Sequence, residues 1–137
     1  ELVKFTSPRN IIISIPVRIE DPRNQSPLLK EPMEIPIVVI AKALSFYLKQ
    51  NFILNNIYWS EVNDLYYILK NTLFDIAMIE PVNPLKAIRD KYSADRFVFS
   101  SNCPLFYPEG NWNKLSYSDM EKNEVEKIAS VNIKKLI

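Results

Sequence analysis

Residues 36–51, PIVVIAKALSFYLKQN, carry the clearest periodic pattern in the chain. Their apolar side chains recur at intervals of three and four, which is the spacing of one face of an α-helix. This face comprises Ile37, Ile40, Ala41, Leu44, Leu48 and Phe52. Pro36 suits the first helical position, because an N–H group there would have no partner within the helix. The pattern predicts a helix from Pro36 to about Asn51.

A second helix is predicted to begin at Ser60, whose hydroxyl can cap it. Glu61 and Asp64 follow in its first turns, where the helix dipole favours negative charge, so we interpret both as structural. The apolar stretch 73–79 either extends this helix or forms a short separate one. Pro81 ends it, because a proline disfavours the helical conformation of the residue before it.

Two further helices are predicted nearer the carboxyl end. Asn83 as a cap and Pro84 at the first position indicate a short helix that reaches about Tyr92. Ser118 followed by Glu121 has the spacing of a capping box, which predicts a final helix. The residues between these helices, 100–117, are expected to be irregular.

Strand signals are short by comparison. The β-branched run Ile11–Ile15 predicts a strand, and Pro16 confines it to an edge or an end. Residues 96–99 alternate and predict another short strand. The expected fold is therefore mainly α, a single helical domain over residues 1–137 with a short N-terminal β element. Residues 1–34 would be a proline-punctuated front segment and residues 35–137 the helical core.

The missing residue types exclude several kinds of chemistry. The 137 residues include no histidine, one glycine (Gly110) and one cysteine (Cys103). A histidine base, a histidine-ligated metal, an intrachain disulfide and a glycine-rich phosphate loop are thus excluded within this chain. Cys103 has no histidine to activate it and is expected to be buried packing. No catalytic residue set, metal or cofactor is expected, and the chain is interpreted as not an enzyme.

Hydropathy and charge suggest where the protein acts. The longest uncharged apolar run, residues 35–41, is far shorter than the roughly 20 residues of a membrane span. No secretory signal is visible, and a single unpaired cysteine fits a reducing compartment. A cytoplasmic location without a membrane partner is therefore expected. The net charge of +1 gives no global reason to expect nucleic acid.

One set of basic and aromatic residues could nevertheless bind a nucleotide or a single strand. Cationic groups bind phosphate, and a tyrosine ring can stack on a base. The candidates are Lys42, Lys49, Tyr67, Lys70, Lys86 and Arg89. The alternative is that these lysines are simply solvated on polar helix faces and that the tyrosine is half-buried.

Several short motifs resemble a known family. They are residues 27–30 (PLLK), 44–49 (LSFYLK), 60–67 (SEVNDLYY), 102–106 (NCPLF) and 112–115 (WNKL), with the capped helix from Ser118. Their order resembles the C-terminal domain of the DNA primase large subunit, which is helical and binds an iron–sulfur cluster through four cysteines. Leu29 stands at the first cysteine position and Cys103 at another. The absence of further cysteines resembles the PriX-type noncatalytic subunit of archaeal DNA primase, a related family without the cluster.

This resemblance implies an accessory role in DNA replication. Such a subunit assists primer initiation by contacting the initiating nucleotide or the single-stranded template. The family's basic and aromatic contacts would fall on Lys42, Lys49 and Tyr67. The implied partners are the catalytic and large primase subunits, a nucleoside triphosphate and single-stranded DNA.

A second resemblance remains open. Glu34-Ile35-Pro36 with Ala41 and Leu44 is similar to a helix entry in GINS replication-complex subunits. That similarity implies a purely structural subunit that acts through protein–protein contacts.

Overall fold

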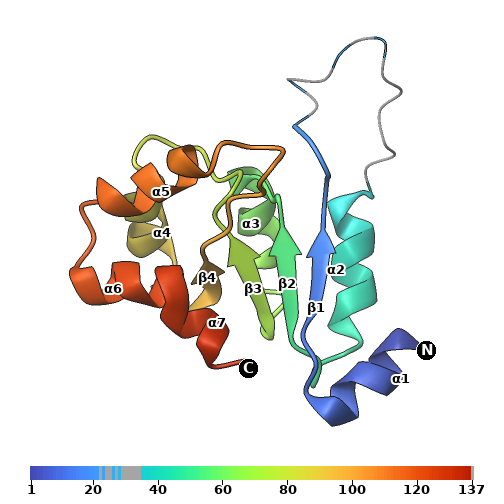
Figure 1. Ribbon diagram of the computed structural model, residues 1–137. Coiled ribbons are helices and arrows are strands. Elements are labelled where there is room, and N and C mark those ends of the chain that lie inside the picture. Colours follow the sequence, from blue (N-terminus) through green and yellow to red (C-terminus); the bar gives the residue numbers. More distant parts are fainter. Residues whose placement is uncertain (22, 24–25, 27, 29–34, 137) are drawn as a thin grey trace.

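A parallel β-sheet forms the centre of the molecule (Figure 1). The computed structural model describes residues 1–21, 23, 26, 28 and 35–136. Within these residues the sheet has four strands in the order β1-β2-β3-β4. They are β1 (Ile13–Pro16), β2 (Phe52–Asn55), β3 (Thr72–Asp75) and β4 (Phe97–Val98). Parallel neighbours need crossover connections, and these contain the helices α2 (Ile37–Ser45), α3 (Trp59–Leu65) and α4 (Pro84–Lys91).

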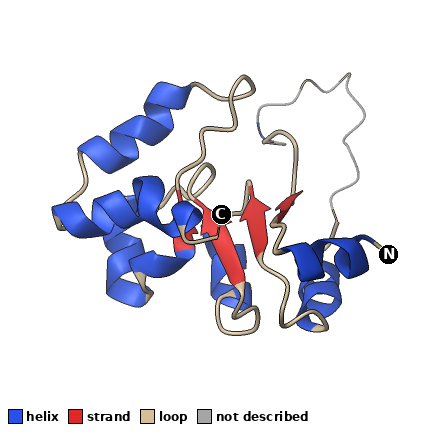
Figure 2. Ribbon diagram, turned by 60° about the horizontal axis from the view of Figure 1, so that its bottom comes forward, coloured by secondary structure: helices blue, strands red, loops and turns tan. Residues whose placement is uncertain are grey.

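One face of the sheet forms the hydrophobic core. Ile15, Leu54 and Phe74 are partners across the first three strands, and Phe74 is in turn the partner of Phe97. Leu54, Phe74 and Phe97 are fully buried in the main core cluster. The alternate residues, such as Ile53, point to the opposite face because side chains alternate along a strand. Figure 2 shows the strands as a central layer with the helices arranged around it.

The prediction of a mainly α-helical domain is wrong. The alternation of parallel strands with helices is an α/β architecture. The sequence reading missed β2 and β3, because it placed Phe52 on a helix face and assigned residues 73–79 to a helix. Short apolar runs look alike in a buried strand and a buried helix, so periodicity could not separate them.

The first predicted helix is shorter than expected. It begins where Pro36 indicated, but α2 ends at Ser45, and a turn leads to β2. The Gln50 side chain fixes this turn: its Nε2 donates to the Ile11 carbonyl (2.7 Å), and its Oε1 accepts from the Thr6 hydroxyl (2.8 Å). These contacts come from residues far away in the sequence, so the periodic pattern could not reveal them.

Some of the remaining local predictions are confirmed and others are wrong. Strands near Ile11–Ile15 and at 96–99 are confirmed, as is the Asn83 cap, which accepts from the Lys86 amide at 3.3 Å. Ser60 is not the cap of α3; Tyr58 holds that position. Residues 100–117 are not wholly irregular, because they contain α5 (Pro108–Ser116). Cys103 is exposed, not buried.

The open edge of β4 is covered by the C-terminal helical segment. This segment comprises α6 (Lys122–Glu126), a π-helical turn (Lys127–Val131) and α7 (Asn132–Lys134). The Phe99 amide donates to the Ile128 carbonyl at 2.8 Å. The Asn132 side chain donates to the Ala94 and Phe97 carbonyls at 2.7 and 2.8 Å. Strand-edge groups that would otherwise lack partners are thus satisfied. The predicted Ser118 cap is wrong: the Ser118 hydroxyl donates to the Leu115 carbonyl, and Glu121 holds the N-cap position of α6 without a side-chain capping hydrogen bond.

The front segment is only partly described. The helix α1 (Leu2–Thr6) and the turn η1 (Ser7–Arg9) precede β1. Leu29, which the family resemblance placed at a cysteine position, lies outside the described residues, as do Pro22 and Pro27. In the described part of the chain, no helix has both the length and the apolar character needed to cross a membrane.

Candidate active site

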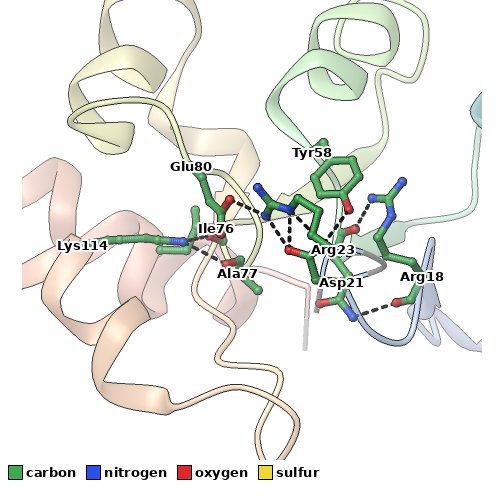
Figure 3. A network of polar contacts seen from close by, with 9 residues as sticks. Arg18, Asp21, Arg23, Tyr58, Ile76, Ala77, Glu80 and Lys114 are labelled. Atoms are coloured by element: carbon green, nitrogen blue, oxygen red, sulfur yellow. Dashed lines mark hydrogen bonds and ion pairs between the residues drawn. The ribbon is translucent and has the colours of Figure 1, made fainter. Parts of the chain in front are cut away.

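Polar and charged side chains gather where the strands end. The described strands are all parallel, so the segments that follow them meet at one edge of the sheet (Figure 1). In α/β folds this carboxyl edge is where ligands bind, because the loops that leave it can vary without disturbing the core. Figure 3 shows the network of polar contacts at this edge.

Arg18, just beyond β1, joins the end of β1 to the start of α3. One guanidinium nitrogen donates to Glu61 Oε2 at 2.9 Å, and a second contacts Glu61 Oε1. The guanidinium carbon lies 3.8 Å from the centre of the Tyr58 ring. Glu61 Oε2 also accepts from the Tyr58 amide at 2.8 Å, which closes the first turn of α3. The Arg18 side chain is almost fully buried, so this pair is sheltered from solvent.

Asp21 forms the next part of the network. Arg23 Nε donates to its two carboxylate oxygens at 2.9 and 2.8 Å, and the Tyr58 hydroxyl donates at 3.3 Å. Hydrogen bonding from Arg23 lowers the pKa of Asp21 despite burial. Arg23 also binds Glu80 at 2.6 Å. The Arg23 guanidinium therefore bridges a carboxylate that follows β1 and one that follows β3 (Figure 3).

Lys114 reaches this edge from α5. Its Nζ donates to the carbonyl oxygens of Ile76 and Ala77, both at 2.9 Å (Figure 3). Burial lowers the pKa of Lys114 to about 8, although the negative charges of Glu80 and Asp75 oppose this shift. Near neutral pH the group can therefore both give and take a proton, which an ordinary surface lysine does not do.

Asp75, the last residue of β3, lies behind the same peptide segment. Its Oδ1 accepts from the amides of Asn56 (3.0 Å) and Ala77 (3.3 Å). Burial raises the pKa of Asp75 to about 6, against the lowering effect of these amides and of Ser100. Ala77 connects the two shifted groups, since its amide binds Asp75 and its carbonyl binds Lys114.

A cavity of about 220 Å³ lies beside this network. It is lined by Asp21, Ala77, Glu80, Phe106, Tyr107, Gly110, Asn111 and Lys114. Asp21 and Asn111 are each only 4% exposed, so the cavity has firmly held polar groups in its wall. Its size suits a small organic molecule, and its walls offer charge, hydrogen bonds and aromatic surface.

A metal centre is not assembled by the residues that the structure describes. No group of three or more carboxylate or thiol ligands gathers among them, and the chain has no histidine.

The residues expected to bind a nucleotide lie elsewhere. Lys42 is on α2 and Lys49 is in the turn after it, whereas Lys86 and Arg89 are on α4, with α3 between the two helices (Figure 1). Tyr67 and Lys70 follow α3, where Lys70 Nζ lies 5.7 Å from the centre of the Tyr67 ring. Lys86 and Arg89 both contact Asp90. The structure thus pairs some of the six residues but does not gather all of them at one site.

The sequence reading missed the residues of the carboxyl edge. Asp75 could have been found, because a carboxylate at the carboxyl end of a buried strand belongs at this edge; this required recognising 72–75 as a strand. Lys114 had no comparable signal, since only the packing of α5 against the segment after β3 buries it.

Comparisons with known proteins agree on the fold. No protein-family model and no curated protein matches the sequence. The structure is similar to an uncharacterised TIM-barrel protein of Bordetella bronchiseptica, with a TM-score of 0.73 and 15% identity over 98% of this chain and 48% of that one. It is also similar to 2,6-dihydroxybenzoate decarboxylase from Rhizobium, with a TM-score of 0.70 and 13% identity over 96% and 52% of the two chains.

A third similar structure is amidohydrolase 2 from Bifidobacterium longum subsp. infantis, with a TM-score of 0.64 and 13% identity. The likeness covers 98% of this chain and 52% of that one. The chain thus spans about half the length of these proteins. At such low identity the likeness establishes the fold, which is a TIM-barrel-like α/β arrangement.

These findings overturn the resemblance to replication proteins. The likeness to TIM-barrel proteins excludes the helical fold implied by a PriX-type primase subunit. The predictions of an accessory subunit in DNA replication, and of a chain that is not an enzyme, are wrong on the same ground, because enzymes are among the similar structures. The same correction applies to the GINS-like alternative.

The expected partners, and the binding role of the six basic and aromatic residues, are not tested by the likeness and stay predictions.

Proposed function

We propose that the protein is an enzyme whose active site is the 220 Å³ cavity at the carboxyl edge of the sheet. Lys114 would hold the carboxylate or carbonyl oxygen of a small organic substrate and supply the proton that the reaction needs. The observation that carries this proposal is the position of the Lys114 amine, which lies in the wall of that cavity and is held by the Ile76 and Ala77 carbonyls.

The geometry of Lys114 supports such a role. Two of the three protons of its ammonium group are directed to the Ile76 and Ala77 carbonyls, so the third is available to a ligand in the cavity. An amine held in this way needs little reorganisation when negative charge develops on a nearby oxygen or carbon. A pKa close to the working pH also favours proton transfer in either direction.

The similar structures support a reaction in which the enzyme donates a proton, such as decarboxylation or amide hydrolysis. In a decarboxylase such as 2,6-dihydroxybenzoate decarboxylase, loss of carbon dioxide leaves a carbanion that must be protonated. In an amidohydrolase, the leaving nitrogen must take a proton. Both needs suit a positioned ammonium group, and the carboxyl edge is where TIM-barrel enzymes place such groups. A cytoplasmic location, expected from the single unpaired cysteine, fits an enzyme of this kind.

A turnover assay tests the proposal. Aromatic carboxylates would be screened for carbon dioxide release and simple amides for amine release, with wild type, Lys114→Met and the control Lys122→Met, which changes an exposed lysine on α6. We expect Lys114→Met to lose about 100-fold or more in rate and Lys122→Met to keep the wild-type rate. Because Lys114 acts protonated, the rate should fall above its pKa of about 8.

Two results would contradict the proposal: no turnover of any compound by wild type, or full activity in Lys114→Met. Circular dichroism would verify that each variant is folded. If Lys114→Met does not fold, Lys114→Arg replaces it, because a guanidinium keeps the charge but does not release its proton near neutral pH.

A further inference from the structure

Two opposite charges line the candidate cavity without pairing with each other. Lys114 and Glu80 both contribute to its wall. Among the residues that the structure describes, the ion pair of Glu80 is with Arg23, and the hydrogen bonds of Lys114 Nζ go to two backbone carbonyls. The two charges are close enough to affect each other, because Glu80 raises the pKa of Lys114. The cavity therefore separates a positive group from a negative one.

Each group keeps one position for a ligand. Arg23 binds Glu80 Oε2, and within the described part of the chain no hydrogen bond to Glu80 Oε1 is found. Lys114 has one proton left after its two carbonyl contacts. Asp21, the other carboxylate in the wall, is already saturated by Arg23 and Tyr58. The free positions are thus one donor on a cation and one acceptor on an anion.

We infer that the cavity binds a small zwitterion, an amino acid, with its carboxylate on Lys114 and its ammonium group on Glu80. A ligand with only a carboxylate would leave Glu80 facing a negative charge, and one with only an amine would bring a second cation toward Lys114. A zwitterion satisfies both groups, and charge-assisted hydrogen bonds of this kind are stronger than neutral ones. This inference rests on the proposed function, because it assigns the substrate class of the same cavity.

The remaining walls fit such a ligand. Phe106 and Tyr107 offer aromatic surface for a short side chain, and the buried Asn111 adds an amide to the lining. The cavity of about 220 Å³ has room for a small amino acid but not for a long peptide.

Binding of three related compounds tests the inference. L-alanine carries both charged groups, propionate lacks the amine, and ethylamine lacks the carboxylate. Titrations followed by NMR or calorimetry should show L-alanine binding about tenfold or more tighter than either analogue, since one charged hydrogen bond is lost in each.

Matched variants assign each end of the ligand. Glu80→Gln should abolish the preference for L-alanine over propionate, and Lys114→Met should abolish the preference over ethylamine. Glu109→Gln, which removes an exposed carboxylate at the start of α5, should change neither. If Lys114→Met does not fold, Lys114→Gln is the substitute, because it keeps most of the side-chain length and removes the charge.

Several outcomes would overturn the inference. One is that propionate or ethylamine binds as tightly as L-alanine. Another is that the preference over propionate survives Glu80→Gln or the preference over ethylamine survives Lys114→Met. A third is that L-alanine does not bind below about 10 mM. Failure of this inference can be told from failure of the proposed function. Binding of amino acids without any turnover contradicts only the proposed function, whereas turnover of carboxylates without a preference for amino acids contradicts only the inference.

Discussion

The carboxyl edge of the sheet and the outer surface of α4 both contain ion pairs, but the two regions differ in their contact with solvent. The side chains of Arg18 and Glu61 are 4% and 17% exposed, whereas those of Lys86 and Asp90 are 48% and 47% exposed. Water solvates the charges on α4 whether or not they are paired. Around Arg18 and Glu61 the protein itself must replace that solvation, so each of these two charges depends on its partner.

This difference explains why chemistry is expected at only one of the two regions. Burial moves the pKa of Lys114 to about 8 and that of Asp75 to about 6, both toward neutrality. On α4, by contrast, hydrogen bonding from Lys86 lowers the pKa of Asp90, which keeps this carboxylate charged. The number of charges in a region is therefore a poor guide to function. What matters is how far the protein has removed them from water.

The largest effect is expected from Arg18→Met. The substitution leaves Glu61 with an uncompensated charge in a sheltered position, and breaking a buried pair in this way typically costs about 3–5 kcal/mol. Urea unfolding would measure the change in the free energy of unfolding. Arg89→Met makes the same chemical change on α4 and should cost much less. Equal losses in the two variants would show that burial does not distinguish the regions.

Asp75→Asn should alter how stability depends on pH. Because the folded-state pKa of about 6 lies above the ordinary value of 3.8, the folded protein holds a proton that the unfolded chain has released. The wild-type free energy of unfolding should therefore fall as pH rises from about 4 to 6, by an amount on the order of 3 kcal/mol. The variant should lack this part of the decline. Urea titrations at several pH values would measure this dependence. If the free energy of unfolding of the two proteins changes with pH in the same way, the raised pKa of Asp75 is refuted.

Lys114→Met should act in a different pH range and with the opposite slope. The folded-state pKa of about 8 lies below the ordinary value of 10.5, so between these values the unfolded chain binds more protons. The wild-type free energy of unfolding should gain a positive contribution as pH rises through this range, and the variant should not. Urea titrations of both proteins from pH 7 to 11 would measure it. Lys122→Met serves as the control and should follow the wild type.

The smallest effect is expected from Lys86→Ala. It removes the partner of an exposed carboxylate, and water replaces the lost contact, so the urea midpoint should stay within experimental error. A clear loss of stability, especially one that persists at high salt, would mean that the surface of α4 is more sheltered than its exposure indicates.

Predictions of helix caps and strands are confirmed where the interactions that fix the structure lie within one short segment. Asn83 caps α4 because its own side chain reaches the Lys86 amide. Ile13–Pro16 forms a strand because β-branched residues favour one and proline limits it to an edge. Neither result required knowledge of distant residues.

Predictions were wrong where distant segments decide the outcome. The end of α2 depends on Gln50, whose partners Thr6 and Ile11 come from the front of the chain. The strands β2 and β3 are fixed by each other, since the ladder pairs Leu54 with Phe74. Their short apolar runs fit a helix equally well until a neighbouring strand is present. The two missed strands concealed the carboxyl edge and the candidate site along with it.

The sequence by itself determined which chemistry the chain lacks and where several helices and strands begin. Without histidine, and with one cysteine and one glycine, it excludes whole classes of site whatever the fold, because those sites need atoms that are absent. Only the tertiary structure decided which of the many charged residues have unusual properties. The pKa of Lys114 depends on its burial and on the charges of Glu80 and Asp75, which lie far from it in the sequence, and no local pattern reveals these.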